Sequence, residues 1–333
     1  MMIFYIGING LVYLSIKVNM AKQLQFELWQ ECGNGCKFCY LQEENKFTPD
    51  KLKIMACNNA YNKISDLSNY PEYDTLAYLG GEFFQGQMKN PEVKNAFMRL
   101  MEKTKQLYLD GYIKHIWVYA TMTIGDQKDL YDMLELYGDL PEFWILTSYD
   151  TIGRFHTSKM EETWKYHMKN IRKLYPHIKL NITTILSEDC IKKYINNEIS
   201  FTDMIKEYDC NFFFKQCGFG GLTKEKMNEI LPGFFPRREI FLEFLKKFKQ
   251  QETPDMWDRL FNIQYRADTL YRNYNDEKHQ MELRQRYKNK RWETDEKVEC
   301  GVNKCGHLMT YAAYIDNEEC VLCDKEMIGE LYE

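Results

Sequence analysis

Two hydrophobic periods alternate along the first two thirds of the chain. Short runs rich in β-branched and aromatic residues are each followed by a longer stretch in which apolar residues recur every three or four positions. The first pattern predicts buried strands and the second predicts amphipathic helices. The predicted strands cover Leu24–Trp29, Leu76–Leu79, His115–Thr123, Phe143–Ser148, Ile178–Ser187 and Asn211–Lys215.

Helices are predicted between these strands. The first has Thr48 as its cap and Pro49 in its first turn, and it runs to about Leu67. The later ones cover Val93–Tyr108, Asp126–Tyr137, Glu161–Tyr175 and the stretch around Ile191–Tyr208. Six strands alternating with helices predict an α/β fold with a parallel sheet. Six units are too few for a closed eight-stranded barrel, so we expect a partial (β/α)6 TIM-like barrel over residues 20–222.

The pattern changes after Gly221. Residues 223–299 carry helical periodicity and little strand signal, so they predict a helical segment. Its clearest helix is opened by Pro236 and has one apolar stripe, made of Ile240, Phe241, Phe244, Leu245 and Phe248. Residues 300–333 are short and rich in cysteine, which predicts a small Cys-rich metal-binding subdomain.

The first nineteen residues are largely apolar from Ile3 to Val18 and are followed closely by Met20. The basic residue Lys17 comes too late for a secretory signal, and the run is short for a membrane span. We therefore expect residues 1–19 to be an extension that precedes the native start. A membrane anchor is the alternative. We expect a cytoplasmic protein with no membrane partner.

The composition is that of a globular protein, with 333 residues and a net charge of -5. That charge gives no reason to expect nucleic acid or a membrane as a partner. The eleven cysteines are unusual, and they cluster at close, unequal spacings. Clusters of this kind are more often metal ligands than disulfide bridges.

Cys32, Cys36 and Cys39 form a C-x3-C-x2-C loop directly after the first predicted strand. Gly33 and Gly35 give this loop the conformational freedom to wrap around a cluster. Three thiolates can hold three irons of a [4Fe-4S] cube and leave the fourth iron open for chemistry. A zinc site or buried thiols are the alternative, although structural zinc usually needs four protein ligands.

This motif, with Phe38 before its last cysteine and Tyr40 after it, resembles the signature of the radical S-adenosylmethionine (SAM) superfamily. The resemblance extends over roughly residues 20–218 as a fold pattern. It implies a [4Fe-4S] cluster and SAM as cofactors, and Phe38 as a residue beside them. It also implies an external electron donor such as flavodoxin or ferredoxin.

Gly80, Gly81 and Glu82 follow the second predicted strand. In the superfamily that this chain resembles, a Gly-Gly-Glu at this place contacts the amino group of SAM. Glycines let a backbone approach a ligand, and a carboxylate accepts from an ammonium. The tripeptide and the cysteine loop both fall at the carboxyl ends of strands, where α/β folds place their chemistry.

Three further residues are candidates for SAM contact, and a fourth is a candidate for contact with a carboxylate or the substrate. Ser148, with Asp150 two residues on, resembles a Ser-x-Asp in which the serine faces SAM. Asn181 and Thr183 share one face of the fifth predicted strand, from which they can reach the ribose. Arg154 is a candidate partner for a carboxylate or a substrate. Exposed or capping roles are the alternative for each of these residues.

A second cysteine group, C-x4-C-x14-C-x2-C, lies near the end of the sequence, at Cys300, Cys305, Cys320 and Cys323. It resembles the half-domain (SPASM or twitch type) that carries an auxiliary [4Fe-4S] cluster in peptide-modifying radical SAM enzymes. The resemblance implies a second Fe–S cluster, and four thiolates suit zinc equally well as donors. Residues 284–291 are basic and precede Trp292, which indicates either nucleic-acid binding or a solvated helix face.

The resemblance implies an enzyme that cleaves SAM reductively and abstracts a substrate hydrogen with the 5′-deoxyadenosyl radical. Whether it is an oxidoreductase or a transferase stays open. The C-terminal cysteines favour a peptide or protein as the substrate. Nucleoside or tRNA modification by the same chemistry is one alternative, and a non-enzymatic zinc-binding interaction module is another.

Overall fold

The structure is a computed structural model that describes residues 3–5, 22–39, 47–69, 73–124, 127–215, 229–234, 236–253, 256 and 260. The four C-terminal cysteines and the basic stretch 284–291 lie outside the described residues. The predictions made for them therefore stay predictions.

A parallel sheet organises the described chain. Its strands are β1 (Ile3–Tyr5), β2 (Lys22–Glu27), β3 (Tyr73–Leu79), β4 (His115–Tyr119), β5 (Phe143–Ser148), β6 (Lys179–Ile185) and β7 (Cys210–Lys215). Their order in the sheet follows their order in the chain, and the pairs from β1 to β5 are all parallel. The α/β class and the parallel sheet are confirmed. The sheet has one strand more than predicted, because Ile3–Tyr5 pairs with β2.

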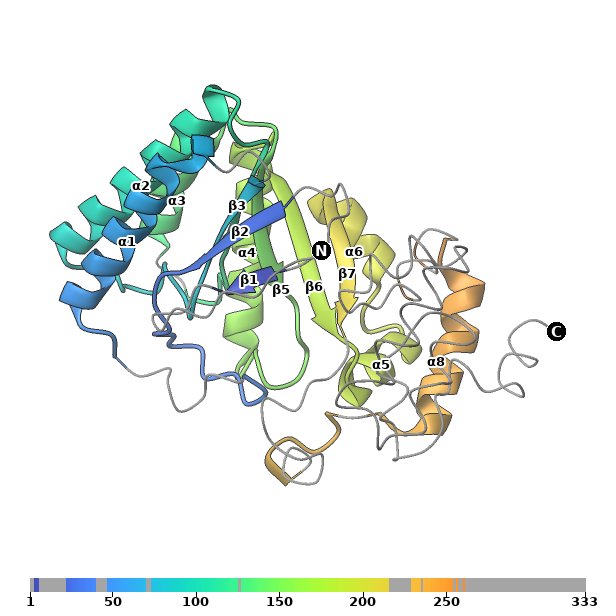
Figure 1. Cartoon of the computed structure of the whole chain (residues 1–333). Coiled ribbons are helices and arrows are strands. Elements are labelled where there is room, and N and C mark those ends of the chain that lie inside the picture. The colour runs from blue at the N-terminus through green and yellow to red at the C-terminus, as the bar shows by residue number, and fades with distance from the viewer. Residues whose placement is uncertain are drawn as a thin grey trace, which may run out of the picture. The chain divides into compact units, whose positions relative to one another are not determined.

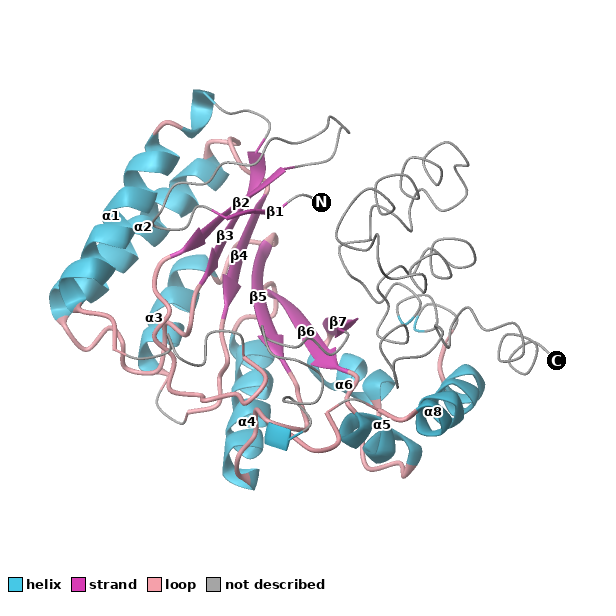
Figure 2. Cartoon of the chain, turned by 60° about the horizontal axis from the view of Figure 1, so that its bottom comes forward, coloured by secondary structure: helices cyan, strands magenta, loops and turns pink. Residues whose placement is uncertain are grey.

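Helices alternate with the strands from β2 onward, and the last of them, α8, follows β7. They are α1 (Asp50–Ser65), η1 (Leu67–Asn69), α2 (Pro91–Leu109), α3 (Lys128–Tyr137), α4 (Ser158–Leu174), α5 (Glu188–Ile195), α6 (Phe201–Tyr208) and α8 (Arg238–Gln251). Helices α1, α2 and α3 lie side by side on one face of the sheet (Figure 1), and the same layering is visible from below (Figure 2). Among the described helices, none combines the length and the apolar character needed to cross a bilayer.

The face of the sheet that the helices cover is apolar. Leu24, Leu76 and Ile116 are aligned across three neighbouring strands, and all are buried. On the same face the hydroxyl of Tyr78 lies 2.5 Å from that of Thr104 on α2. The opposite face carries polar side chains that are also buried, among them Gln23, Gln25, Thr75 and Asn181. The sheet therefore has a packed side and a polar side.

The chain divides into two compact units. One comprises Met1–Ser148, Arg154–Ile182 and Ile205–Asn211, and the other comprises Tyr149–Gly153, Thr183–Met204 and Phe212–Glu333. Both cofactor loops expected from the sequence lie in the first unit.

The second unit has an aromatic core of its own. In it Tyr194 stacks on Phe201, with ring centroids 5.1 Å apart, and packs against Phe244 and Phe248 of α8. Four residues of the predicted apolar stripe of α8 are fully buried, namely Phe241, Phe244, Leu245 and Phe248, whereas Ile240 is partly exposed. The hydroxyls of Tyr194 and Thr202 donate to the carboxylate of Glu252 at the end of α8.

Two local predictions were wrong. Thr48 does not cap α1: the cap position is Pro49, and the backbone N–H of Thr48 donates instead to Glu31 Oε2 at 3.1 Å. The stretch around Ile191–Tyr208 is two helices, because the chain turns at Asn197, whose φ is 59°. Asparagine tolerates this left-handed conformation, which ends a helix.

Candidate functional site

The cysteine loop follows β2 directly. Cys36 is buried, whereas Cys32 and Cys39 are partly exposed. The loop turns tightly, since the N–H of Cys39 donates to the carbonyl of Cys36 at 2.9 Å. Gly35 has φ 60°, a conformation that other residues adopt at a cost. The wrap predicted from the glycine spacing is thus present at Gly35.

The three thiols lie near one another. Burial raises the pKa of Cys32 to about 12, the N–H of Asn34 opposes that rise, and Glu82, Cys36 and Cys39 add to it by charge repulsion. Without a metal, Cys32 therefore holds its proton at neutral pH. A metal has to displace that proton to bind.

Among the residues that the structure describes, no three His, Cys, Asp or Glu side chains are grouped so as to hold one metal ion. The ligands of a [4Fe-4S] cluster bind different irons, so they do not need to converge on one point. Three cysteine sulfurs on one loop are the donors that such a cluster uses. The donor set therefore fits a cluster in its chemistry, and the three residues that would hold it are Cys32, Cys36 and Cys39.

The Gly-Gly-Glu segment follows β3, and its backbone is hydrogen-bonded to the residues that directly precede the cysteine loop. The N–H of Gly81 donates to the carbonyl of Trp29 at 2.8 Å, and the N–H of Glu82 donates to the carbonyl of Glu31 at 2.9 Å. A Cβ on Gly80 would lie 2.2 Å from the Trp29 oxygen, and one on Gly81 would lie 2.2 Å from the Gln30 oxygen. The glycines are thus required for contact between the two loops themselves.

Glu82 is buried, and its carboxylate accepts three backbone hydrogen bonds. Oε1 accepts from the N–H groups of Phe83 and Phe84, each at 3.0 Å, and Oε2 accepts from that of Thr121 at 2.5 Å. Burial raises the pKa of Glu82, and these bonds oppose the rise. The side chain therefore joins the end of β3 to the end of β4. Lone pairs remain on its oxygens for a further donor.

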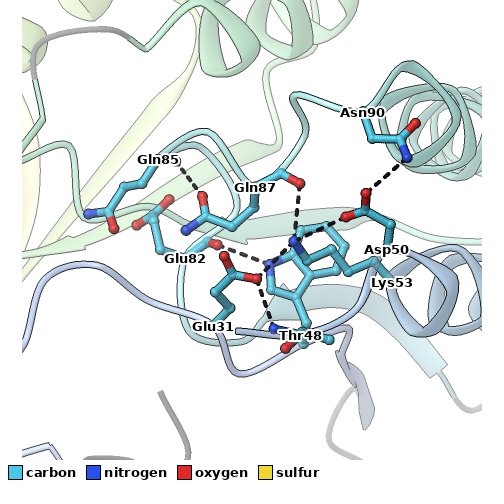
Figure 3. Close-up of polar contacts among 9 residues, drawn as sticks. Glu31, Thr48, Asp50, Lys53, Glu82, Gln85, Gln87 and Asn90 are labelled. Atoms are coloured by element: carbon cyan, nitrogen blue, oxygen red, sulfur yellow. Dashed lines mark hydrogen bonds and ion pairs between the residues drawn. The ribbon is translucent and has the colours of Figure 1, made fainter. Parts of the chain in front are cut away.

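An ion pair that the sequence analysis missed lies beneath both loops (Figure 3). Lys53 of α1 is almost fully buried, and its Nζ lies 2.8 Å from Glu31 Oε2 and 3.7 Å from Asp50 Oδ1. The same ammonium donates to the carbonyl of Gln87 at 3.3 Å. Since Glu31 precedes Cys32 and Gln87 follows the Gly-Gly-Glu segment, Lys53 ties helix α1 to both loops.

The remaining candidates have varied surroundings. The guanidinium of Arg154 lies 5.6 Å from the ring centroid of Phe38, so these two predicted residues contact each other. Ser148 ends β5 and is half-buried. Asp150 is buried and accepts from the N–H of Ile185 at 2.9 Å, a structural use of its carboxylate. The carbonyl of Thr183 accepts from the N–H of Tyr149 at 2.8 Å.

Asn181 is buried on the polar face of the sheet, and its Oδ1 has no hydrogen-bond partner among the described residues. The side-chain amide of Gln23 on the same face also lacks one. Buried polar atoms are almost always bonded, so these atoms indicate a polar occupant or water on this face. Asn181 was named from strand alternation alone, and this observation fits a residue that meets a polar ligand.

Comparison with known proteins gives little further guidance. No family model matches the chain, and no curated protein matches it. A solved structure described as native anSMEcpe with bound AdoMet and Cp18Cys peptide is similar in fold, with 16% sequence identity and a TM-score of 0.45. The match covers 71% of this chain and 60% of that one. The match thus spans less than two thirds of that protein's length.

Proposed function

We propose that this protein is a radical SAM enzyme. The observation that carries the proposal is the direct bonding of a three-cysteine loop to a Gly-Gly-Glu segment at the carboxyl ends of the neighbouring parallel strands β2 and β3. The cysteines supply three ligands to a [4Fe-4S] cluster, and the fourth iron is free for SAM. Neither feature alone carries the proposal.

When bound, the cluster and SAM supply a reductive cleavage that yields methionine and a 5′-deoxyadenosyl radical, which takes a hydrogen atom from the substrate. The chain's own residues bind and orient these partners. In the proposal Gly80, Gly81 and Glu82 receive the amino group of SAM, and Phe38 flanks the site. The other proposed SAM contacts are Ser148, Asn181 and Thr183.

In the proposal, the carboxylate of Glu82 is already oriented before SAM binds. This carboxylate already fixes the backbone of three residues, so its oxygens are held in place before any ligand arrives. An ammonium donor that reaches this carboxylate meets an acceptor that needs no reorganisation. The indole Nε1–H of Trp29 also donates to the backbone carbonyl of Glu82 at 3.0 Å.

The substrate class that we propose is a peptide or protein. The proposed substrate class rests on the resemblance of the four C-terminal cysteines to an auxiliary-cluster half-domain. An external one-electron donor is the second proposed partner. Nucleoside or tRNA modification is the second candidate, favoured by the basic stretch 284–291.

The proposal is tested by anaerobic reconstitution with iron and sulfide, followed by detection of 5′-deoxyadenosine under reducing conditions. We expect the wild-type protein to hold a [4Fe-4S] cluster and to form 5′-deoxyadenosine, and we expect Cys36→Ala to form none. Cys57→Ala is the matched control, because that buried thiol belongs to helix α1 and is not part of the cysteine loop. A colourless wild-type protein with stoichiometric zinc would identify a binding module instead of an enzyme.

A further inference from the structure

Asn34, between the first two cysteines, makes several hydrogen bonds within and beyond the cysteine loop. It is 2 % exposed. Its backbone N–H donates to Cys32 Sγ at 3.4 Å, and its side-chain Nδ2 donates to Cys36 Sγ at 3.4 Å. One residue thus directs two N–H groups at the sulfurs of two expected cluster ligands.

The orientation of the Asn34 amide follows from its neighbours. The backbone N–H of Gly33 can only donate, and it meets Gln85 Oε1 at 2.8 Å. The other end of the Gln85 amide is therefore Nε2, which donates to Asn34 Oδ1 at 3.3 Å. The hydroxyl of Thr123 also bonds this oxygen. With Oδ1 fixed as the acceptor, Nδ2 is the atom that faces the Cys36 sulfur.

Three strand ends hold this arrangement in place. Gln85 follows β3, and its own N–H is held by Gln87 Oε1 at 2.7 Å (Figure 3). Thr121 follows β4 and accepts from Gln85 Nε2 at 3.0 Å. His156 follows β5, and its Nε2 lies 2.7 Å from the carbonyl of Asn34. Because a carbonyl only accepts, that nitrogen carries the proton. The Asn34 amide is thus held on several sides.

We propose that Asn34 is a positioning residue that raises the reduction potential of the cluster, an inference that rests on the proposed function. Reduction adds one electron from the external donor and makes the ligand sulfurs more negative. An N–H dipole directed at a sulfur stabilises the reduced state more than the oxidised state, and hydrogen bonds to the sulfurs are a known determinant of Fe–S potentials. Burial strengthens the effect because water does not screen it.

The test is a redox titration of the reconstituted cluster followed by electron paramagnetic resonance. Asn34→Leu keeps the approximate volume and removes the donor. We expect its reduction to be about tenfold less favourable, which is about 59 mV lower for a one-electron couple. Asn34→Asp keeps the shape but places a carboxylate oxygen against the sulfur, so we expect a larger shift in the same direction. Asn58→Asp on α1, which faces Arg99, makes the same charge change away from the loop and should leave the potential unchanged.

The outcomes separate this inference from the proposed function. A wild-type protein that holds no cluster overturns both. Wild-type, Asn34→Leu and Asn34→Asp clusters of equal potential overturn the inference alone. If Asn34→Leu does not retain iron, the reduction potential of the cluster is measured in Gln85→Glu instead. The carboxylate of this variant still accepts from the N–H of Gly33 but no longer donates to Asn34. An unchanged potential in that variant also overturns the inference.

Discussion

The Lys53–Glu31 pair places the amino group of Lys53 in a nearly waterless position. The Lys53 side chain is 3% exposed and that of Glu31 is 22% exposed, and the rings of Phe47 and Trp29 lie about the ammonium at 5.7 and 6.0 Å. Losing one partner of a buried pair leaves an uncompensated charge, which costs about 3–5 kcal/mol. The cost of removing one partner differs between the two residues, because Lys53 is much more deeply buried than Glu31.

We therefore predict that Glu31→Leu destabilises the protein more than Lys53→Met does. The first change removes the nearest carboxylate of Lys53 and leaves it the Gln87 carbonyl at 3.3 Å and Asp50 at 3.7 Å, so it should lower the free energy of unfolding by about 3 kcal/mol. Urea denaturation measures both. Glu161→Gln removes one partner of the more exposed Glu161–Lys165 pair and is the control, with an expected change below about 0.5 kcal/mol. Equal losses at Glu31 and Lys53 would contradict the assignment.

Buried charged and polar residues such as Lys53 could not be identified from the sequence. On α1 the apolar Leu52 is 43% exposed while its neighbour Lys53 is buried, the reverse of what hydrophobicity predicts. Lys53 is inside because residues distant in the sequence supply its partners. The same holds for Asn34 and Gln85, which are fifty-one positions apart. The cysteines and glycines, in contrast, were found because their spacing within one loop carries the signal.

At the scale of elements, the contact between the loops after β2 and β3 is a backbone contact. A side chain on Gly81 would meet the carbonyl oxygens of Gln30 and Glu31 at 2.2 and 2.3 Å. Both obstacles are main-chain atoms, so a new methyl group is accommodated only if the loops separate. Separation breaks the bonds from Gly81 and Glu82 to Trp29 and Glu31.

We predict that Gly81→Ala lowers both the stability and the iron content of the reconstituted protein. Overpacking of this kind costs about 1–3 kcal/mol. Gly111→Ala is the control, because a Cβ there meets nothing within 4 Å and its φ of +79° gives a purely conformational cost of about 1–2 kcal/mol. Iron should be retained in the control and lost from Gly81→Ala. Full iron retention in Gly81→Ala would show that the two loops tolerate separation.

The presence of the strands and helices was predicted better than the residues at which they begin and end. Hydrophobic runs located β2 to β7, because each strand carries β-branched, aromatic or aliphatic side chains that are buried on at least one face of the sheet. The break between α5 and α6 was missed, since a single left-handed residue, Asn197, interrupts a stretch that is helical in its periodicity. The cap of α1 was misplaced because Thr48 is held by Glu31, a partner the local sequence does not contain.

At the scale of the whole molecule, the two cysteine groups are far apart in the sequence and predict separate metal sites. We predict about eight irons per chain if each group holds a [4Fe-4S] cluster. A Cys320→Ala, Cys323→Ala double variant should then hold about four and still form 5′-deoxyadenosine. Iron and sulfide analysis with metal mass spectrometry measures this. A wild-type protein with about four irons and one zinc would assign zinc to the C-terminal group.

The two bonds that join the loops after β2 and β3 continue the hydrogen-bond ladder of the sheet beyond its last paired strand residues. The amide protons of Gly81 and Glu82 should accordingly exchange with solvent as slowly as those of the strands. If the protein holds the proposed cluster, a chain from which the cluster has been removed would keep the two loops of the candidate site bonded to each other. A cluster lost to oxygen would then be restored by supplying iron and sulfide, without refolding the protein.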